Sequence, residues 1–163
     1  GFIMPNQTTN LKLNTWNETD VVNFEEINAN FEKLDTMVMC IESGTKTAPY
    51  TGGYGDSIAT WHYKKYSDGT IDMSAKLTYS NLKCNGETSQ GIFYSGSSKV
   101  TFPFEFRDVF DLQMHMASNS NAWISDINNT SIYNDVTFRL LAMHKETDEI
   151  YRQVFINVKG VLA

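Results

Sequence analysis

The large apolar residues near the start of the chain recur at the spacing of one helical face. They stand three and four residues apart, at Phe24, Ile27, Phe31, Leu34, Val38 and Ile41. This spacing keeps a single narrow stripe on a helix. Asn23 occupies the N-cap position, Glu26 would complete a capping box, and Ser43-Gly44 supplies a stop. The pattern predicts a helix over residues 24–41, about 27 Å long.

The stripe is narrower than that of a helix that packs on its own domain. Such a helix usually has a third apolar position beside the seam. Here the flanking positions hold Asn28, Asn30, Asp35 and Met37. A narrow seam favours packing against further copies of the same helix, and bulky phenylalanines fit three strands better than two. We expect the six seam residues to form a trimer interface; docking on the helix's own domain is the alternative.

From residue 58 onward, apolar and polar residues alternate with the period of a β-strand. Residues 71–79 form the clearest run, and residues 58–66 precede it across Ser67-Asp68-Gly69. A three-residue turn with Gly69 in the left-handed conformation places apolar side chains beside apolar ones, whereas a two-residue turn does not. The predicted register pairs Tyr63 with Met73 and Trp61 with Ala75.

Further alternating runs cover residues 100–106, 110–116, 136–142 and 150–158, and the last two are expected to form a hairpin. About eight short strands without a long helix after Gly44 predict a mainly β fold, an antiparallel β-sandwich. Pro49 and the Gly52-Gly53 pair indicate a linker. We therefore expect an attachment segment with a coiled-coil helix at 1–44, a linker at 45–57 and a β-sandwich head at 58–163.

Composition and charge exclude several classes of protein. The 163 residues are 41% hydrophobic with a formal net charge of −6, which predicts a folded chain and argues against nucleic-acid binding. No apolar run approaches the ~18 residues of a spanning helix, so membrane insertion is not expected. No charged-then-apolar leader opens the chain, and Met4 is the expected natural start.

The residues with reactive side chains do not form a recognisable catalytic set. Cys40 and Cys84 are interpreted as free thiols, and His62, His115 and His144 each stand alone in an alternating stretch. Nucleophile, zinc and dinucleotide motifs are absent. Converging carboxylates of a glycan hydrolase stay open as the minor alternative. We expect no enzymatic activity, no metal site and no cofactor.

Residues 118–135 have the composition of a recognition surface. The segment is rich in asparagine and serine but contains large apolar side chains. Amides supply adaptable hydrogen bonds, and aromatic rings supply rigid faces for stacking. The candidate receptor-binding residues are Asn119, Asn121, Trp123, Asn129 and Tyr133, with Tyr94 from another predicted loop. The alternative interpretation places Trp123 in an ordinary core strand.

Short motifs in both halves of the chain resemble one family. The first runs from Thr8-Thr9-Asn10-Leu11 to Trp16 and continues through Asp20-Val21-Val22, Phe24, Ile27-Asn28, Asn30-Phe31 and Leu34-Asp35. It resembles the amino-terminal signature of tail fibre and baseplate proteins from phages and prophages of Gram-positive bacteria. The stretch from Trp61 to Thr70 is similar to a "W-x-Y-R-K-W-x-D-G-T" hairpin of their heads, and Phe102-Pro103-Phe104 to Val109 is similar to a "P-F-x-F-x-x-V" strand. Tyr66 and Lys64 depart from the Trp and Arg usual in that hairpin.

The resemblance implies a homotrimeric tail fibre or baseplate component of a virion, made in the bacterial cytoplasm. It also implies that the amino-terminal region joins other tail or baseplate proteins, and that the β head binds a host surface glycan or other receptor. Three heads on one axis would raise avidity for a weakly bound ligand. The alternative is a structural connector that docks virion proteins without receptor binding.

Overall fold

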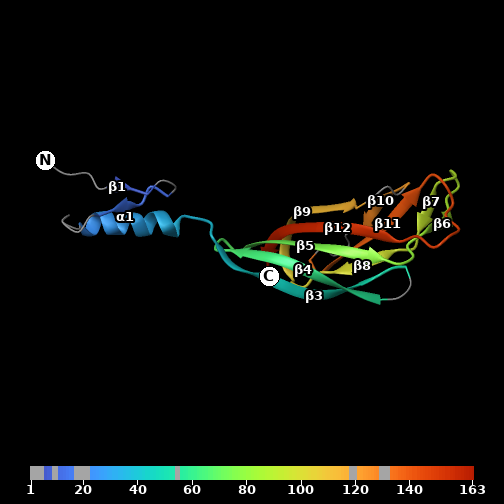
Figure 1. Ribbon diagram of the computed structural model, residues 1–163, viewed down its shortest axis with the longest axis horizontal. Coiled ribbons are helices and arrows are strands. Elements are labelled where there is room, and N and C mark those ends of the chain that lie inside the picture. The colour runs from blue at the N-terminus through green and yellow to red at the C-terminus, as the bar shows by residue number, and fades with distance from the viewer. Residues whose placement is uncertain (1–5, 9–10, 17–22, 54–55, 118–120, 129–132) are drawn as a thin grey trace. The chain divides into compact units, whose positions relative to one another are not determined.

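The computed structural model describes residues 6–8, 11–16, 23–53, 56–117, 121–128 and 133–163. The chain divides into two compact units, Gly1–Met39 and Cys40–Ala163. Figure 1 shows the helical part of the first unit and a strand-rich second unit. Each unit is described by itself.

The amino-terminal unit consists of a two-stranded antiparallel ladder, β1 (Asn6–Gln7) with β2 (Asn14–Thr15), and the helix α1 (Phe24–Asp35). As predicted, Asn23 caps the helix, since its side chain accepts a hydrogen bond from the Glu25 amide. The carboxylate of Glu26 instead accepts the indole N–H of Trp16 at 3.0 Å. It therefore joins the helix to the segment before it rather than completing a capping box.

The helix is 12 residues long and ends at Asp35, so the predicted end at residue 41 was wrong. Thr36 closes the last turn because its amide donates to the carbonyls of Glu32 and Leu34 and its hydroxyl donates to the carbonyl of Lys33. Of the six predicted seam residues, Val38 and Ile41 lie beyond the helix, and Ile41 belongs to a strand of the second unit. A coiled-coil stalk over residues 24–41 is therefore not present in this chain.

The carboxy-terminal unit is a large antiparallel sheet. Its strands are β3 (Cys40–Thr51), β4 (Asp56–Tyr66), β5 (Thr70–Tyr79), β6 (Cys84–Glu87), β7 (Phe93–Ser95), β8 (Ser98–Thr101), β9 (Phe106–Met116), β10 (Ala122–Asn128), β11 (Asp135–Ala142) and β12 (Arg152–Leu162). The order across the sheet is β6-β7-β11-β8-β3-β4-β5-β12-β9, and β10 pairs with β11. The mainly β fold is confirmed.

The hairpin of β4 and β5 has the register that the sequence predicts. Trp61 lies opposite Ala75, and Tyr63 lies opposite Met73. Gly69 has a φ of +83°, the left-handed conformation that the three-residue turn requires. The Asp68 carboxylate accepts hydrogen bonds from the amide and the hydroxyl of Thr70, which fixes the turn.

Three strand predictions were wrong. Residues 45–57 lie largely in β3 and β4 instead of forming a linker. Pro49 is accommodated because β3 pairs with β8 only at Tyr50, so most of that edge needs no amide donor. The run 100–106 is divided between β8 and β9. Finally, β11 and β12 do not form a hairpin, since β12 pairs with β5 and β9.

The core forms where distant strands of the sheet approach each other. The Tyr79 ring on β5 meets the Phe138 ring on β11 with a centroid distance of 6.2 Å, although three strands separate β5 from β11 in the sheet order. The Tyr79 hydroxyl also lies 2.6 Å from the hydroxyl of Ser98 on β8. Both side chains are buried. The sheet therefore curls so that strands far apart in the sheet order contribute to one apolar core.

The last two strands of the curled sheet do not run in a regular ladder. The register between β12 and β9 shifts twice, next to Gly160 and next to Leu162. A side chain at position 160 would not fit, because a Cβ there would lie 2.2 Å from the carbonyl oxygen of Asp108. The irregularity falls on β9, which is the end strand of the sheet path.

A buried ion pair fixes the segment between β11 and β12. The Arg152 guanidinium, 2% exposed, donates hydrogen bonds to both carboxylate oxygens of Glu146 and to the Leu82 carbonyl. The same carboxylate accepts the Cys84 amide at 2.6 Å. Burial alone would raise the pKa of Glu146, but the hydrogen bonds from Arg152 and Cys84 and the positive charge outweigh it and hold the pKa below its usual value of 4.5.

This ion pair predicts a pH-dependent contribution to stability. A carboxyl group whose pKa is lower in the folded state stabilises the fold above its unfolded pKa, and that contribution is lost as pH falls through the folded pKa. We expect the native chain to have a higher melting temperature than Glu146→Gln at pH 7, with the difference shrinking from about pH 4.5 downward. Circular dichroism melts between pH 3 and 7 would measure it.

Glu149→Gln is the matched control because Glu149 is exposed and lies three residues away in the same segment. Its melting temperature should follow that of the native chain at every pH. A constant difference between the native chain and Glu146→Gln across the whole range would contradict the assignment.

Candidate functional site

Two of the predicted recognition residues lie in one row across neighbouring strands. Tyr94 on β7 is the cross-strand partner of Leu141 on β11, and Leu141 is also the partner of Trp123 on β10. Partners in an antiparallel ladder project from the same face of the sheet. The residues next to Leu141 in the chain, Leu140 and Ala142, are buried, so the row faces outward. We call Tyr94, Leu141 and Trp123 the aromatic row.

The Tyr94 ring is held over the sheet surface by its surroundings. It lies over Gly86 on β6, where an added Cβ would be 2.4 Å from the ring carbon Cε2. The Arg139 guanidinium lies 5.7 Å from the centroid of the same ring, within cation–π range. Glycine at position 86 therefore allows the ring to occupy this place, and Arg139 adds a charged hydrogen-bond donor beside it.

The aromatic row is an apolar stripe on the outer face, with Arg139 beside it on β11. Trp123 is 40% exposed, while Leu141 and Tyr94 are half-buried. Two strand spacings separate Tyr94 from Trp123, about 10 Å between backbones. Aromatic rings with amphipathic edges and adjacent polar groups bind ligands that have both apolar faces and hydroxyl groups. The row thus has the dimensions and chemistry to contact a short oligosaccharide.

The other predicted recognition residues do not join the row. Tyr133 is 46% exposed but precedes β11 at the end opposite Leu141. Leu141 lies six positions after Asp135 along the strand, a distance of about 20 Å. Asn121 is exposed immediately before β10. Asn119 and Asn129 lie outside the described residues. Within the described part of the chain, Trp123 and Tyr94 are the predicted residues that the fold brings together.

Sequence patterns alone did not reveal Gly86, Arg139 and Leu141 as neighbours of the predicted aromatics. They lie 8 residues before Tyr94 or 16 and 18 residues after Trp123 in the chain. Their contact depends on β11 pairing with both β7 and β10. No local signal specifies that pairing, so the row emerges only from the folded structure.

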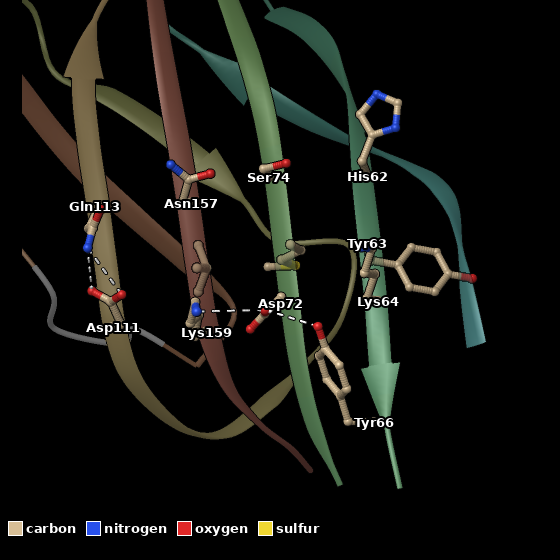
Figure 2. Close-up of a pocket in the computed structure, with 12 residues that line it drawn as sticks. His62, Tyr63, Lys64, Tyr66, Asp72, Ser74, Asp111, Gln113, Asn157 and Lys159 are labelled. Carbon is tan, nitrogen blue, oxygen red and sulfur yellow. Dashed lines mark hydrogen bonds and ion pairs between the residues drawn. The ribbon is translucent and has the colours of Figure 1, made fainter. Parts of the chain in front are cut away.

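A hollow of about 490 Å³ lies on the outer face of β4, β5, β12 and β9. Figure 2 shows His62, Ser74, Asn157 and Gln113 placed on four adjacent strands. The registers confirm the row, since Ser74 is the partner of His62 and of Asn157, and Asn157 is the partner of Gln113. Short polar side chains therefore cross the hollow in one line, which we call the polar row.

A second row of alternating charge lies beside the polar row. Its members in strand order are Lys64, Asp72, Lys159 and Asp111. Asp72 lies 3.7 Å from the Lys159 ammonium and accepts the Tyr66 hydroxyl at 3.3 Å (Figure 2). Partial burial and the charge of Asp72 raise the pKa of Tyr66, so its hydroxyl remains a donor at neutral pH. We call these four residues the charged row.

The helix α1 carries a third candidate surface, which is apolar. Phe24 is 82% exposed and Phe31 is 61% exposed, whereas Ile27 and Leu34 are half-buried. The polar flank of the helix is occupied by the preceding segment through reciprocal hydrogen bonds between Asn14 and Asn30, at 2.7 and 2.9 Å. The segment thus covers the polar flank of the helix, while both phenylalanines stay exposed.

Comparisons with known proteins found no match among protein-family models, curated proteins or solved structures. Among the described residues, no group of three or more His, Cys, Asp or Glu side chains is arranged to hold a metal ion. None of the helices in the described part of the chain combines the length and apolar character needed to cross a membrane.

Proposed function

We propose that this protein is a homotrimeric tail fibre or baseplate component of a phage or prophage of Gram-positive bacteria, whose β head binds a host surface glycan. The family resemblance of residues 8–35 and 58–110 supports the virion role. One structural observation carries the trimer: the exposed phenylalanine stripe of α1. The aromatic row supports glycan binding by the head.

Burying the exposed phenylalanine stripe between copies of the chain would lower the free energy. Fully burying one phenylalanine side chain stabilises an assembly by about 1.5–3 kcal/mol. Each copy of the chain supplies two such side chains, Phe24 and Phe31. The segment before α1 holds the polar flank of the helix and so orients the stripe away from that flank. Three copies arranged about an axis would bury six phenylalanine side chains in one small core.

The exposed apolar residues continue past the helix. Val38 is 60% exposed and Ile41 is 65% exposed. Four or more apolar residues exposed close together in a chain are typical of an interaction surface. We therefore keep the six predicted seam residues as candidates for self-association, five of them in the amino-terminal unit and Ile41 on β3 of the second unit.

For the head, we propose two packed layers of strands, a β-sandwich. Its support is contact between side chains at distant places in the sheet order: Tyr79 against Phe138, and Trp61 on β4 against Phe102, with a centroid distance of 5.7 Å. The weak link between β3 and β8, a single pair at Tyr50, is the place where one layer would pass into the other.

Solution mass tests the assembly. Light scattering on the full chain should give three times the 18.5 kDa of one copy, at protein concentrations from about 1 to 100 µM. A mass of one copy across that range would contradict the proposal. A mass of two copies would contradict the arrangement of three helices about an axis but would still agree with self-association through the stripe.

Glycan binding by the aromatic row can be tested by substitution. Trp123→Ala and Tyr94→Ala each remove an aromatic face, and either change should lower binding to a glycan array and to host cells about tenfold or more, since three heads multiply each loss. Tyr151→Ala is the matched control because Tyr151 is also exposed, at 62%, but lies outside the row.

Equal loss in all three variants would contradict the role of the row. An assembled trimer that binds no glycan and no cells, but is retained by another tail protein, would support the structural connector instead.

A further inference from the structure

Two adjoining hollows on the outer face of the head share one set of side chains. The hollow of about 490 Å³ in Figure 2 and a neighbouring one of about 750 Å³ are both lined by His62, Ser74 and Asn157. Volumes of this size are in the range of small-molecule sites. The polar row therefore lies at the centre of a continuous depression, with different chemistry on its two sides.

The polar row presents hydrogen-bonding groups that the protein itself does not use. Within the described part of the chain, the side chains of His62, Ser74 and Asn157 have no hydrogen-bond or ion-pair partner. Each can both donate and accept. Neighbouring members stand one strand spacing apart, about 4.8 Å. Such a line matches a ligand with several adjacent hydroxyl groups, which also donate and accept.

The charged row on one side of the depression limits the charge of the ligand. Lys64 and Lys159 alternate with Asp72 and Asp111, so positive and negative charges are equal in number within this row, while Lys76 lines the larger hollow on the other side. An anion would meet two carboxylates and a cation would meet two ammonium groups. A neutral ligand meets neither penalty, and its hydroxyls can donate to carboxylates and accept from ammonium groups.

The other side of the depression carries an aromatic wall on the solvated face of the sheet. The Phe155 ring of β12 stacks on the His115 ring of β9, with centroids 5.2 Å apart and an interplanar angle of 21°. Both residues line the larger hollow. An ordinary solvated sheet face needs polar side chains alone, whereas a stacked phenylalanine offers a flat apolar surface to the C–H face of a sugar ring.

We propose that this depression is a second saccharide-binding site of the head, specific for a neutral sugar unit. The sugar's hydroxyls bind the polar row, and its apolar face packs on the wall formed by Phe155 and His115. The site deepens the proposed glycan-binding function and rests on it for the ligand class, but it uses strands and residues separate from the aromatic row.

The test uses saturation-transfer NMR on the full chain with four neutral probes, glucose, galactose, rhamnose and N-acetylglucosamine, and with glycerol phosphate as an anionic probe. At least one neutral sugar should show transfer. Asn157→Ala and Phe155→Ala should each weaken its binding about fivefold to tenfold, the loss of one hydrogen bond or one packed ring face. Both side chains project from the outer face, so melting curves should confirm that the variants fold.

Two controls separate this site from its surroundings and from the aromatic row. Gln153→Ala changes the same face of β12 outside both hollows and should leave sugar binding unchanged. In a Trp123→Ala background, where part of the aromatic row is removed, Asn157→Ala and Phe155→Ala should still weaken the sugar binding that remains. Absence of transfer from all four sugars overturns the inference, as does a preference for glycerol phosphate or a loss confined to Trp123→Ala. The mass and array measurements judge the proposed function independently.

Discussion

Phe31→Asp is expected to convert the proposed trimer into single copies of 18.5 kDa while the carboxy-terminal unit stays folded. Phe31 is 61% exposed in one copy and lies in the middle of the stripe, so self-association would surround it with apolar side chains. A carboxylate placed there would be buried without a partner, at a cost of several kcal/mol in the assembly. Light scattering gives the mass, and circular dichroism reports on the sheet.

Glu32→Lys is the matched control for this substitution. Glu32 is exposed at the next position of α1 and points away from the stripe, about 100° around the helix from Phe31. The change alters the charge by two units, yet it should leave the trimer intact. A trimer that survives Phe31→Asp would show that the heads hold the assembly together, and the role of the stripe would be lost.

Glu146→Ala is expected to lower the free energy of unfolding by about 3–5 kcal/mol, because it leaves the Arg152 guanidinium buried without its carboxylate. For a chain of this size the melting temperature should fall by about 10 °C or more. Denaturant titration followed by circular dichroism measures the change. The Cys84 amide would lose its carboxylate acceptor, and the hydrogen bond from Arg152 to the Leu82 carbonyl would no longer be supported by the ion pair.

A double substitution separates the ion pair from the space that it fills. In Glu146→Leu together with Arg152→Met, both charges are replaced by apolar side chains, so no charge remains buried. We expect this variant to recover most of the stability lost in Glu146→Ala. If the double variant is less stable than Glu146→Ala, the hydrogen bonds to Leu82 and Cys84 matter more than the burial of charge.

Local rules in the sequence accounted for the parts of the fold that depend on near neighbours. The register of β4 and β5 followed from matching apolar faces across Gly69. The start of α1 followed from Asn23. The end of α1 was missed because Thr36, an ordinary helix residue by propensity, closes the last carbonyls with its amide and hydroxyl. Val38 and Ile41 therefore keep the apolar spacing of the helix although they lie beyond its end.

Long-range pairing accounts for the parts that the sequence could not predict. The alternation of β11 and β12 was recognised, but alternation does not say which strands become neighbours, and each pairs elsewhere. The same limit applies to the candidate sites. Trp123 and Tyr94 were identified by composition, whereas their connection through Leu141 depends on two separate ladders. The polar row needs four strands in register before its members share a hollow.

The irregular ladder between β12 and β9 bears on whether the sheets of neighbouring molecules can pair through their edge strands. A straight outermost strand can recruit a strand from another molecule and start open-ended polymers. The displaced register beside Gly160 bends β9 away from that geometry, and the glycine cannot be replaced without moving the Asp108 carbonyl. We expect closely spaced heads to stay separate for this reason, so that association is confined to surfaces with complementary side chains.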